Sequence, residues 1–141
     1  MPKKPAKQSK PRPSKPKHVP TPGLDGWITH TDLSSRDPAA TKAFCATVFG
    51  WKFGPSFPMP GGSAYHLFAY SEQGGGGIRS LDRGEAPGSI PYVHVADTEA
   101  AFDAALRAGA EAVHPPERVM EGVTVAQVRA PGGVRLGLSG P

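Results

Sequence analysis

The strongest constraint on this chain is an internal repeat with a period of about sixty residues. Residues 30–51 contain an apolar strand, an aspartate, an amphipathic helix and a glycine in that order, and residues 92–109 repeat the order. Such a repeat predicts two similar structural units, because one unit alone leaves its apolar face uncovered. We therefore expect the functional residues to lie in the hollow between two similar halves.

Both halves carry clear signals for the start and the end of a helix. Asp37 followed by Pro38 predicts a helix start, because a carboxylate accepts hydrogen bonds from free N–H groups and proline is tolerated at the first helical position. Gly50 predicts the end of this helix, since glycine readily adopts the left-handed backbone that terminates helices. Asp97 and Gly109 mark a second helix in the same way.

Runs of strand-forming residues bounded by Pro- and Gly-rich turns predict the rest of the fold. The expected strands cover residues 27–33, 51–56, 64–70, 76–81, 92–96, 112–119, 123–129 and 134–138. The order βαβββ therefore occurs twice, in module one at about 25–82 and in module two at about 90–141. The sequence predicts an α+β fold in which two tandem modules form a curved, cup-shaped mixed sheet.

The basic charge of the chain is concentrated near its N-terminus. The 141 residues carry a formal charge of +4, but residues 1–24 hold seven of the 16 basic residues and no acidic residue. We expect this Lys/Pro-rich tail to be disordered, because it has too few apolar residues to form a core, and to precede one folded domain at 25–141. Its lysines leave nucleic acid as an alternative partner, through salt-sensitive phosphate contacts.

Composition also limits the compartment. No segment approaches the ~20 apolar residues of a membrane helix, so no membrane partner is expected. The N-terminus lacks the apolar stretch of a secretory signal. The single cysteine, Cys45, excludes an internal disulfide framework and is typical of a reducing cytoplasm. We expect a cytoplasmic protein, either a monomer or a homodimer.

Residues 30–53 and 91–137 resemble the vicinal-oxygen-chelate superfamily of glyoxalases, bleomycin-resistance proteins and extradiol dioxygenases. Within them, the stretch FCATVFGW at 44–51 is similar to the FYxxVFGW stretch of small bacterial glyoxalase-like proteins. The resemblance covers nearly all of residues 26–139 and implies a cup-shaped sheet. It implies less about the reaction, because this fold supports unrelated chemistries.

The resemblance further implies a divalent metal held in the cup by His and Glu side chains from four strand positions. The first of these positions is His30, a proper ligand. The equivalent position in the second half falls on Pro91, the last-strand position falls on Gly137, and the remaining one falls near the glycine run 74–77. The resemblance therefore implies an incomplete metal site. We expect no cofactor, and a divalent metal is the alternative.

Strand alternation selects the side chains expected to line the cup. Asp32 shares the face of His30, Arg135 shares the face of Gly137, and His66 lies on a strand whose facing the sequence leaves open. Arginine offers a fixed fork of donors, and histidine can donate or accept near neutral pH. The predicted residues for binding a small organic ligand with a polar or anionic end are His30, Asp32, His66 and Arg135.

Two structural interpretations stand beside this site. His30 and Asp32 could pair only with each other or with the backbone, in a cup that has no dedicated ligand. On the strand at 92–96, Val93 and Val95 are expected to share the cup face of Pro91. His94 then faces the second helix, where we expect it to make a structural hydrogen bond.

Three functions remain open from the sequence, and no residue receives a catalytic role. The leading hypothesis is a metal-independent protein of this superfamily that binds a small organic ligand in its cup. The alternative is a divalent-metal-dependent lyase, isomerase or dioxygenase, with a metal held by His30, Asp32 and His66. The second alternative is an interaction protein that works through its basic tail.

Overall fold

The computed structural model describes residues 23–59 and 62–141. The tail expected at 1–24 thus lies almost entirely outside the described residues. The elements, in chain order, are β1 (Ile28–Ser35), α1 (Pro38–Phe49), β2 (Lys52–Phe53), β3 (Phe57–Pro58), β4 (Ala64–Ala69), β5 (Gly75–Ser80), β6 (Gly88–His94), α2 (Thr98–Arg107), β7 (Glu111–Met120), β8 (Val123–Arg129) and β9 (Arg135–Gly140). Neither helix in this part of the chain is long and apolar enough to cross a membrane.

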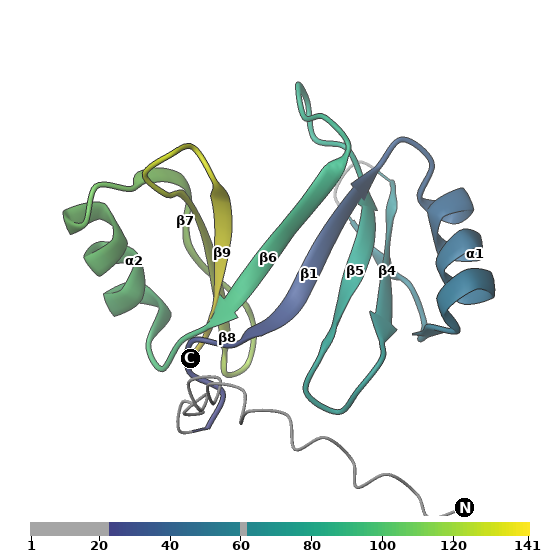
Figure 1. The fold of residues 1–141 in the computed structure, drawn as a ribbon, viewed down its shortest axis with the longest axis horizontal. Helices are drawn as coiled ribbons and strands as arrows, with labels where there is room; N and C mark the ends of the chain where they lie inside the picture. Colours follow the sequence, from purple (N-terminus) through teal and green to yellow (C-terminus); the bar gives the residue numbers. More distant parts are fainter. Residues whose placement is uncertain (1–22, 60–61) are drawn as a thin grey trace, which may run out of the picture.

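The strands form one mixed sheet whose two halves repeat the same arrangement. Its order is β2-β4-β5-β1-β6-β9-β8-β7, and β3 pairs with β4. The antiparallel strands β1 and β6 lie at the centre, and each has a parallel neighbour, β5 for β1 and β9 for β6. Figure 1 shows the sheet bent into two facing walls, with α1 and α2 on the outer sides. The predicted α+β fold with a curved, cup-shaped sheet is confirmed.

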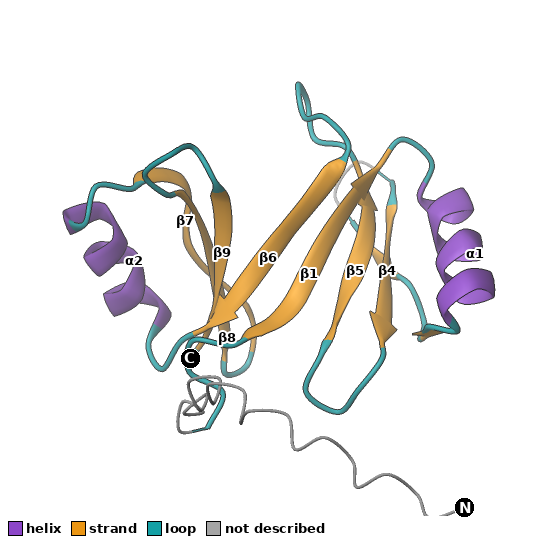
Figure 2. Cartoon of the chain, in the orientation of Figure 1, coloured by secondary structure: helices purple, strands orange, loops and turns teal. Residues whose placement is uncertain are grey.

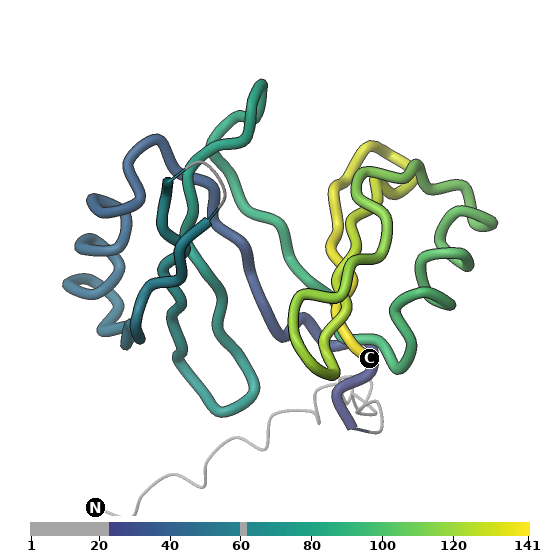
Figure 3. Tube along the Cα trace, turned by 180° about the vertical axis from the view of Figure 1, so that it is seen from behind, coloured from purple at the N-terminus to yellow at the C-terminus, as the bar shows by residue number. Residues whose placement is uncertain are grey.

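The helices begin where the sequence predicts. The Asp37 carboxylate accepts a hydrogen bond from the backbone N–H of Ala40, and Gly50 ends α1 with a left-handed backbone, φ 69°. Asp97 caps α2 through the N–H of Ala100. The two helices cover equivalent outer faces of the sheet, as the secondary-structure colouring of Figure 2 and the reverse view of Figure 3 show.

The apolar cores lie between each helix and the outer face of its half-sheet. Phe102 of α2 packs against buried apolar residues of β8 and β9, namely Ala126, Val128 and Leu138. In the other half, α1 packs against β5, and both Cys45 of the helix and Ile78 of the strand are buried. Because the helices occupy the outer faces, the inner faces of the two halves are left for polar side chains.

Several strand bounds differ from the predicted ones, most clearly those of β2 and β6, and the short strand β3 was not predicted. β2 has only two residues, whereas a strand at 51–56 was expected, and β6 begins at Gly88 instead of near residue 92. The early start of β6 follows from its pairing with β1, which extends to Ser34 opposite Gly88. Pairing with a neighbouring strand here outweighs the low strand propensity of glycine and proline.

Candidate functional site

The inner face of the sheet carries a connected group of polar side chains, which we call the cup network. Its members come from both halves and from the loop that joins them: His30, Asp32, Tyr65, Arg79, Glu85, Tyr92, Gln127 and Arg135. Each member contacts the next, so the group runs around the inner face as a closed circuit.

The first part of the cup network joins β1, β4 and β5. The Tyr65 hydroxyl donates to Oδ1 of Asp32 at 2.7 Å and lies 2.7 Å from Nε2 of His30. Since the hydroxyl proton points to Asp32, Nε2 of His30 must donate to the Tyr65 oxygen. The other ring nitrogen, Nδ1, then carries the lone pair of a neutral imidazole. Oδ2 of Asp32 accepts a bond of 2.6 Å from Nε of Arg79.

Glu85 connects the two halves through its carboxylate. Arg79 donates to both of its oxygens, at 2.6 Å from Nη1 to Oε1 and at 2.8 Å from Nη2 to Oε2. Arg135 of β9 donates to Oε2 from Nη1 at 3.1 Å. A two-pronged arginine–carboxylate pair is among the stronger hydrogen-bonded contacts in proteins. The carboxylate of one loop residue therefore links β5 of the first half with β9 of the second.

The second half completes the circuit through an amide and an aromatic ring. Nε of Arg135 donates to Oε1 of Gln127 at 2.9 Å, and Nε2 of Gln127 donates to the hydroxyl of Tyr92 at 2.5 Å. The Tyr92 ring then meets the His30 ring edge-on, with centroids 5.6 Å apart and an interplanar angle of 88°. Gln127 and Tyr92 are thus bonded within the network, and Arg135 uses its Nε and Nη1 there.

Burial sets the protonation states in the cup network. Burial lowers the pKa of His30, with a smaller opposing effect of Asp32, so the imidazole is neutral at neutral pH. Burial also raises the pKa of Tyr65, which keeps its hydroxyl protonated. The hydrogen bonds from Arg79 lower the pKa of Glu85 to about 2. The network therefore holds a neutral acceptor at His30 beside ionised carboxylate–guanidinium pairs.

The structure brings three of the four predicted ligand-binding residues together. His30, Asp32 and Arg135 all belong to the cup network. His66 does not, because its neighbour Tyr65 faces the inner side of β4 and adjacent strand residues face opposite sides. Nδ1 of His66 instead lies 2.6 Å from the Ser56 hydroxyl. A metal-binding cluster of His30, Asp32 and His66 is therefore not formed.

Five members of the cup network were missed by sequence reasoning, and they are Tyr65, Arg79, Glu85, Tyr92 and Gln127. Arg79 carried a signal in the sequence, because it follows Gly77 of the glycine run at a two-residue spacing and so shares its face. Gln127 faces the cup because it pairs with Gly137, and this pairing is seen only in the fold. Glu85 carries no such signal, because it lies in the loop at 81–87.

The predicted facing of β6 is wrong. The register pairs His30 with Tyr92, whose side chain reaches the cup network, so Pro91 and Val93 face the opposite side. The position seven residues before the second helix cap is Ile90, which is the true counterpart of His30. Ile90 is apolar, so the second half still supplies no metal ligand there.

His94 lies on the side of Tyr92 and not on the side of the second helix, which corrects a further prediction. Its Nδ1 is 3.2 Å from Oδ1 of Asp25, so the expected hydrogen bond exists with a partner outside the helix. Val95, expected to face the cup, packs against the core beneath α2. All of these corrections have one cause: the prediction for β6 was displaced by one residue, to Pro91 instead of Ile90.

The residues at the family's metal positions do not fit a metal ion. A Cβ atom at Gly77 would overlap the ring of Tyr65, and one at Gly137 would overlap the ring of Tyr92. The two tyrosine rings occupy the space in which carboxylate ligands would have to lie. Within residues 23–59 and 62–141, no three His, Cys, Asp or Glu side chains are grouped as ligands.

A hollow of about 450 Å³ adjoins His30. Its other lining residues come from the β4–β5 hairpin and the start of β2, among them Leu67, Gln73 and Lys52. This hollow gives a small molecule space beside the cup network, next to the imidazole.

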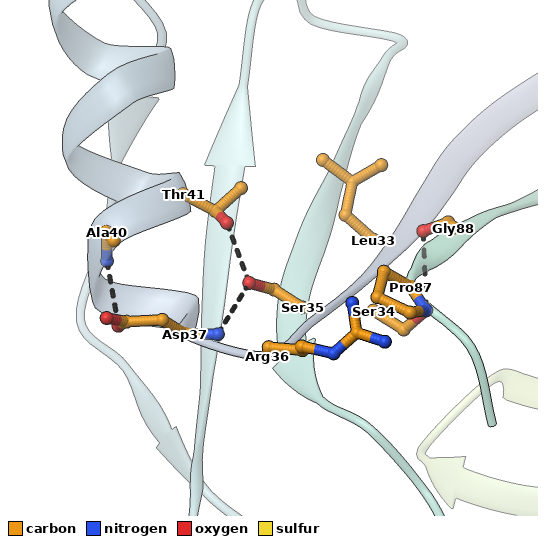
Figure 4. Close-up of a pocket in the computed structure, with 9 residues that line it drawn as sticks. All are labelled: Leu33, Ser34, Ser35, Arg36, Asp37, Ala40, Thr41, Pro87 and Gly88. Carbon is orange, nitrogen blue, oxygen red and sulfur yellow. Dashed lines mark hydrogen bonds between the residues drawn. The ribbon is translucent and has the colours of Figure 1, made fainter. Parts of the chain in front are cut away.

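A second hollow, of about 390 Å³, lies at the start of α1 (Figure 4). Its hydroxyl groups and its carboxylate already have partners: the Ser35 hydroxyl is 2.7 Å from that of Thr41 and accepts from the N–H of Asp37 at 3.0 Å. The carboxylate of Asp37 also caps the helix through Ala40. Its one cationic group is the exposed side chain of Arg36, whereas the cup joins buried charged groups from both halves, so the cup remains the candidate site.

The chain matches a known family along most of its length. The sequence model of the Glyoxalase/Bleomycin resistance protein/Dioxygenase superfamily matches residues 27–138. The chain is also 26% identical over 121 residues to "Putative glyoxylase CFP32" of Mycobacterium tuberculosis and of Mycobacterium bovis. That match covers 82% of this chain and 45% of the relative, so the chain spans about half the length of these curated relatives.

Solved structures share the fold at low sequence identity. Methylmalonyl-CoA epimerase from Mycobacterium tuberculosis superposes with a TM-score of 0.68 at 16% identity, covering 88% of this chain and 93% of the epimerase. A methylmalonyl-CoA epimerase in complex with methylmalonyl-CoA and NH4+ gives a TM-score of 0.61 at 17% identity, covering 83% and 94%. At this identity the likeness concerns the fold alone.

Proposed function

The chain belongs to the Glyoxalase/Bleomycin resistance protein/Dioxygenase superfamily, and from this premise we propose that it binds a small organic molecule in its cup without a metal ion. The polar or anionic end of this molecule would contact His30, Asp32 and Arg135. The observation that carries the proposal is the cup network itself. A closed circuit of polar side chains covers the inner face of the sheet, while tyrosine rings cover Gly77 and Gly137.

Two groups of the cup network support recognition of a ligand. The neutral His30 ring keeps a lone pair on Nδ1, which forms no hydrogen bond with any described residue. The Arg135 side chain is 24% exposed, and its Nη2 likewise donates to no group in the described part of the chain. An acceptor on one wall and a cationic donor on the other suit a molecule with a donor group and a polar or anionic end.

The fold is compatible with an organic ligand, whereas the residues near the metal positions do not favour the metal-dependent alternative. The related epimerase structure contains methylmalonyl-CoA, so a protein of this fold accommodates an organic molecule. A lyase, isomerase or dioxygenase that depends on a divalent ion needs three or four ligands around it. In this chain Gly137 stands at one of those positions and the glycine run 74–77 lies near another, and the rings of Tyr92 and Tyr65 lie against Gly137 and Gly77.

The test combines a ligand screen with a pair of matched variants. We expect small carboxylic acids from a mixed panel to shift the NMR signals of His30, Tyr65 and Tyr92. Arg135→Ala should weaken their binding about tenfold, since a hydrogen bond to a charged group contributes about 1.5–3 kcal/mol. The control is Arg129→Ala, which removes an exposed arginine from the neighbouring strand β8. Equal affinities for the two variants would contradict the proposed site.

Metal analysis distinguishes the proposed metal-independent binding from the metal-dependent alternative. We expect protein purified without chelator to contain less than stoichiometric Mn, Fe, Ni or Zn. A stoichiometric divalent ion that is lost in His30→Ala would establish the metal-dependent alternative and overturn the proposed function.

A further inference from the structure

The loop at 81–87, between β5 and β6, is exposed but carries one buried carboxylate. Asp82, Arg83 and Gly84 are exposed, as are the two residues that follow Glu85. The Glu85 side chain itself is only 9% exposed. Figure 1 shows this loop projecting beyond the ends of β5 and β6. An exposed loop thus inserts a single charged side chain into the cup network.

The Glu85 carboxylate is held as a bound carboxylic acid would be held. Arg79 presents two donors to its two oxygens, and Arg135 adds a third donor from the opposite half. The planar fork of arginine matches a carboxylate with two parallel bonds, whatever molecule carries it. Arg79 and Arg135 together therefore form a complete carboxylate-binding site, and the carboxylate of Glu85 occupies it.

The charges around the pair favour an anionic occupant. Arg79 keeps Asp32 as a partner at 2.6 Å when Glu85 is disregarded. Arg135 has only Glu85 as a carboxylate partner within the described residues, and its remaining bond goes to the neutral amide of Gln127. Asp82, an exposed residue of the same loop, lies 3.6 Å from Arg79, so without this loop two guanidinium groups would face only the buried carboxylate of Asp32. One negative charge supplied by a ligand would restore the balance.

The loop has few other attachments. The Ser34 hydroxyl contacts the backbone oxygens of Ala86 and Gly88 at 3.4 and 3.3 Å, which are long hydrogen bonds. A tight turn links the N–H of Glu85 to the oxygen of Asp82 at 3.0 Å. This turn lies within the loop and can move with it. The exposed Asp82 carboxylate lies 3.6 Å from Arg79, farther than the buried Glu85 carboxylate at 2.6 Å. The Glu85 carboxylate is therefore the main contact between the loop and the cup.

We propose that Arg79 and Arg135 bind the carboxylate of the ligand and that Glu85 occupies this position in the free protein as an internal competitor. The incoming carboxylate replaces that of Glu85, and the loop at 81–87 moves outward. The inference rests on the proposed function and deepens it, because it restricts the ligand to molecules with a carboxylate. No covalent step is involved, and the charge of the site is the same before and after the exchange.

Acetate tests this inference, with acetamide as its uncharged counterpart. Glu85→Ala should bind acetate about tenfold more tightly than the wild type, because the internal competitor is gone. Asp82→Asn is the matched control, since it removes an exposed carboxylate of the same loop, 3.6 Å from Arg79. The dissociation constants come from titrations that follow the Nε–Hε NMR signals of Arg79 and Arg135. Acetamide should bind none of the three proteins, and equal acetate affinities for Glu85→Ala and Asp82→Asn would overturn the inference.

A second variant covers the case in which Glu85→Ala does not fold. Glu85→Gln keeps the size of the side chain and removes its charge, so it should also gain acetate affinity over Asp82→Asn, and no gain would again overturn the inference. The proposed function is tested separately, by the ligand screen with the mixed panel of organic molecules. Panel binding to the wild type without any gain of acetate affinity rejects only the arginine-pair site. Acetate binding by the Glu85 variants without panel binding supports that site and contradicts the broader function.

Discussion

At the scale of single residues, the decisive group is the imidazole of His30. Its Nε2 is committed to Tyr65, and its ring edge contacts Tyr92. Burial lowers its pKa more than the nearby charge of Asp32 raises it. The ring is therefore kept neutral, as an acceptor on Nδ1, by the same side chains that orient it. A protonated His30 would instead present a donor to the ligand.

The lowered pKa of His30 predicts how stability depends on pH. Between its pKa in the folded protein and the ordinary value of 6.5, the unfolded chain binds a proton that the folded chain does not. The free energy of unfolding should therefore decrease as the pH falls through this window, and recover as the pH rises above it. Urea unfolding at several pH values measures this, with His30→Gln as the variant that should lose this part of the dependence. An imidazole NMR signal for His30 that titrates at or above 6.5 would contradict the prediction.

At the scale of the elements, the two helices bury different amounts of apolar surface. Phe102 of α2 is 7% exposed and lies in the core of the second half. On α1, Phe44 is 56% exposed and Val48 is 57% exposed, although both recur at helical spacing. The apolar repeat in α1 therefore predicts the helix correctly but does not identify the buried face, which is occupied by Cys45.

This difference predicts unequal effects of phenylalanine removal. Phe102→Ala should lower the free energy of unfolding by about 3–5 kcal/mol, because it leaves a cavity in the core. Phe44→Ala, on the exposed face of α1, should change it by less than about 0.5 kcal/mol. Urea denaturation of both variants measures the two effects. A loss at Phe44 as large as that at Phe102 would show that the outer face of α1 is covered.

The elements were largely predictable, whereas the facing of two strands was not. The helix caps Asp37 and Asp97 depend on residues within one turn, so local sequence reveals them. The side chain of Tyr92 faces the cup because β6 pairs with β1 in a register that places Tyr92 opposite His30. A one-residue shift exchanges the two faces of a strand, and the pairing that sets it is not local.

At the scale of the whole molecule, the two halves are joined by the central strands and by one carboxylate. β1 and β6 pair along their length, and Glu85 connects Arg79 with Arg135. The repeat predicts the first of these connections, since two similar halves must meet. The second depends on a loop residue 50 positions from Arg135, and only the folded arrangement brings them together.

The charge asymmetry of the whole chain leads to a prediction about its N-terminal segment. Residues 1–22 carry seven basic residues, so their deletion changes the formal charge from +4 to −3. We expect the deletion to abolish retention on immobilised DNA at low salt and to leave the affinity of the cup for carboxylates unchanged. Column elution across a salt gradient measures the first effect, and NMR titration measures the second. Undiminished DNA retention would contradict a role of this segment in nucleic-acid contact.

The tyrosines over Gly77 and Gly137 have a consequence for how this lineage can change. A glutamate introduced at position 137 alone would collide with the Tyr92 ring, and one at position 77 would collide with Tyr65. Shrinking either tyrosine first would break hydrogen bonds to Gln127 or Asp32. A carboxylate ligand at either position therefore requires at least two substitutions, and the first of them removes a hydrogen bond or creates a clash.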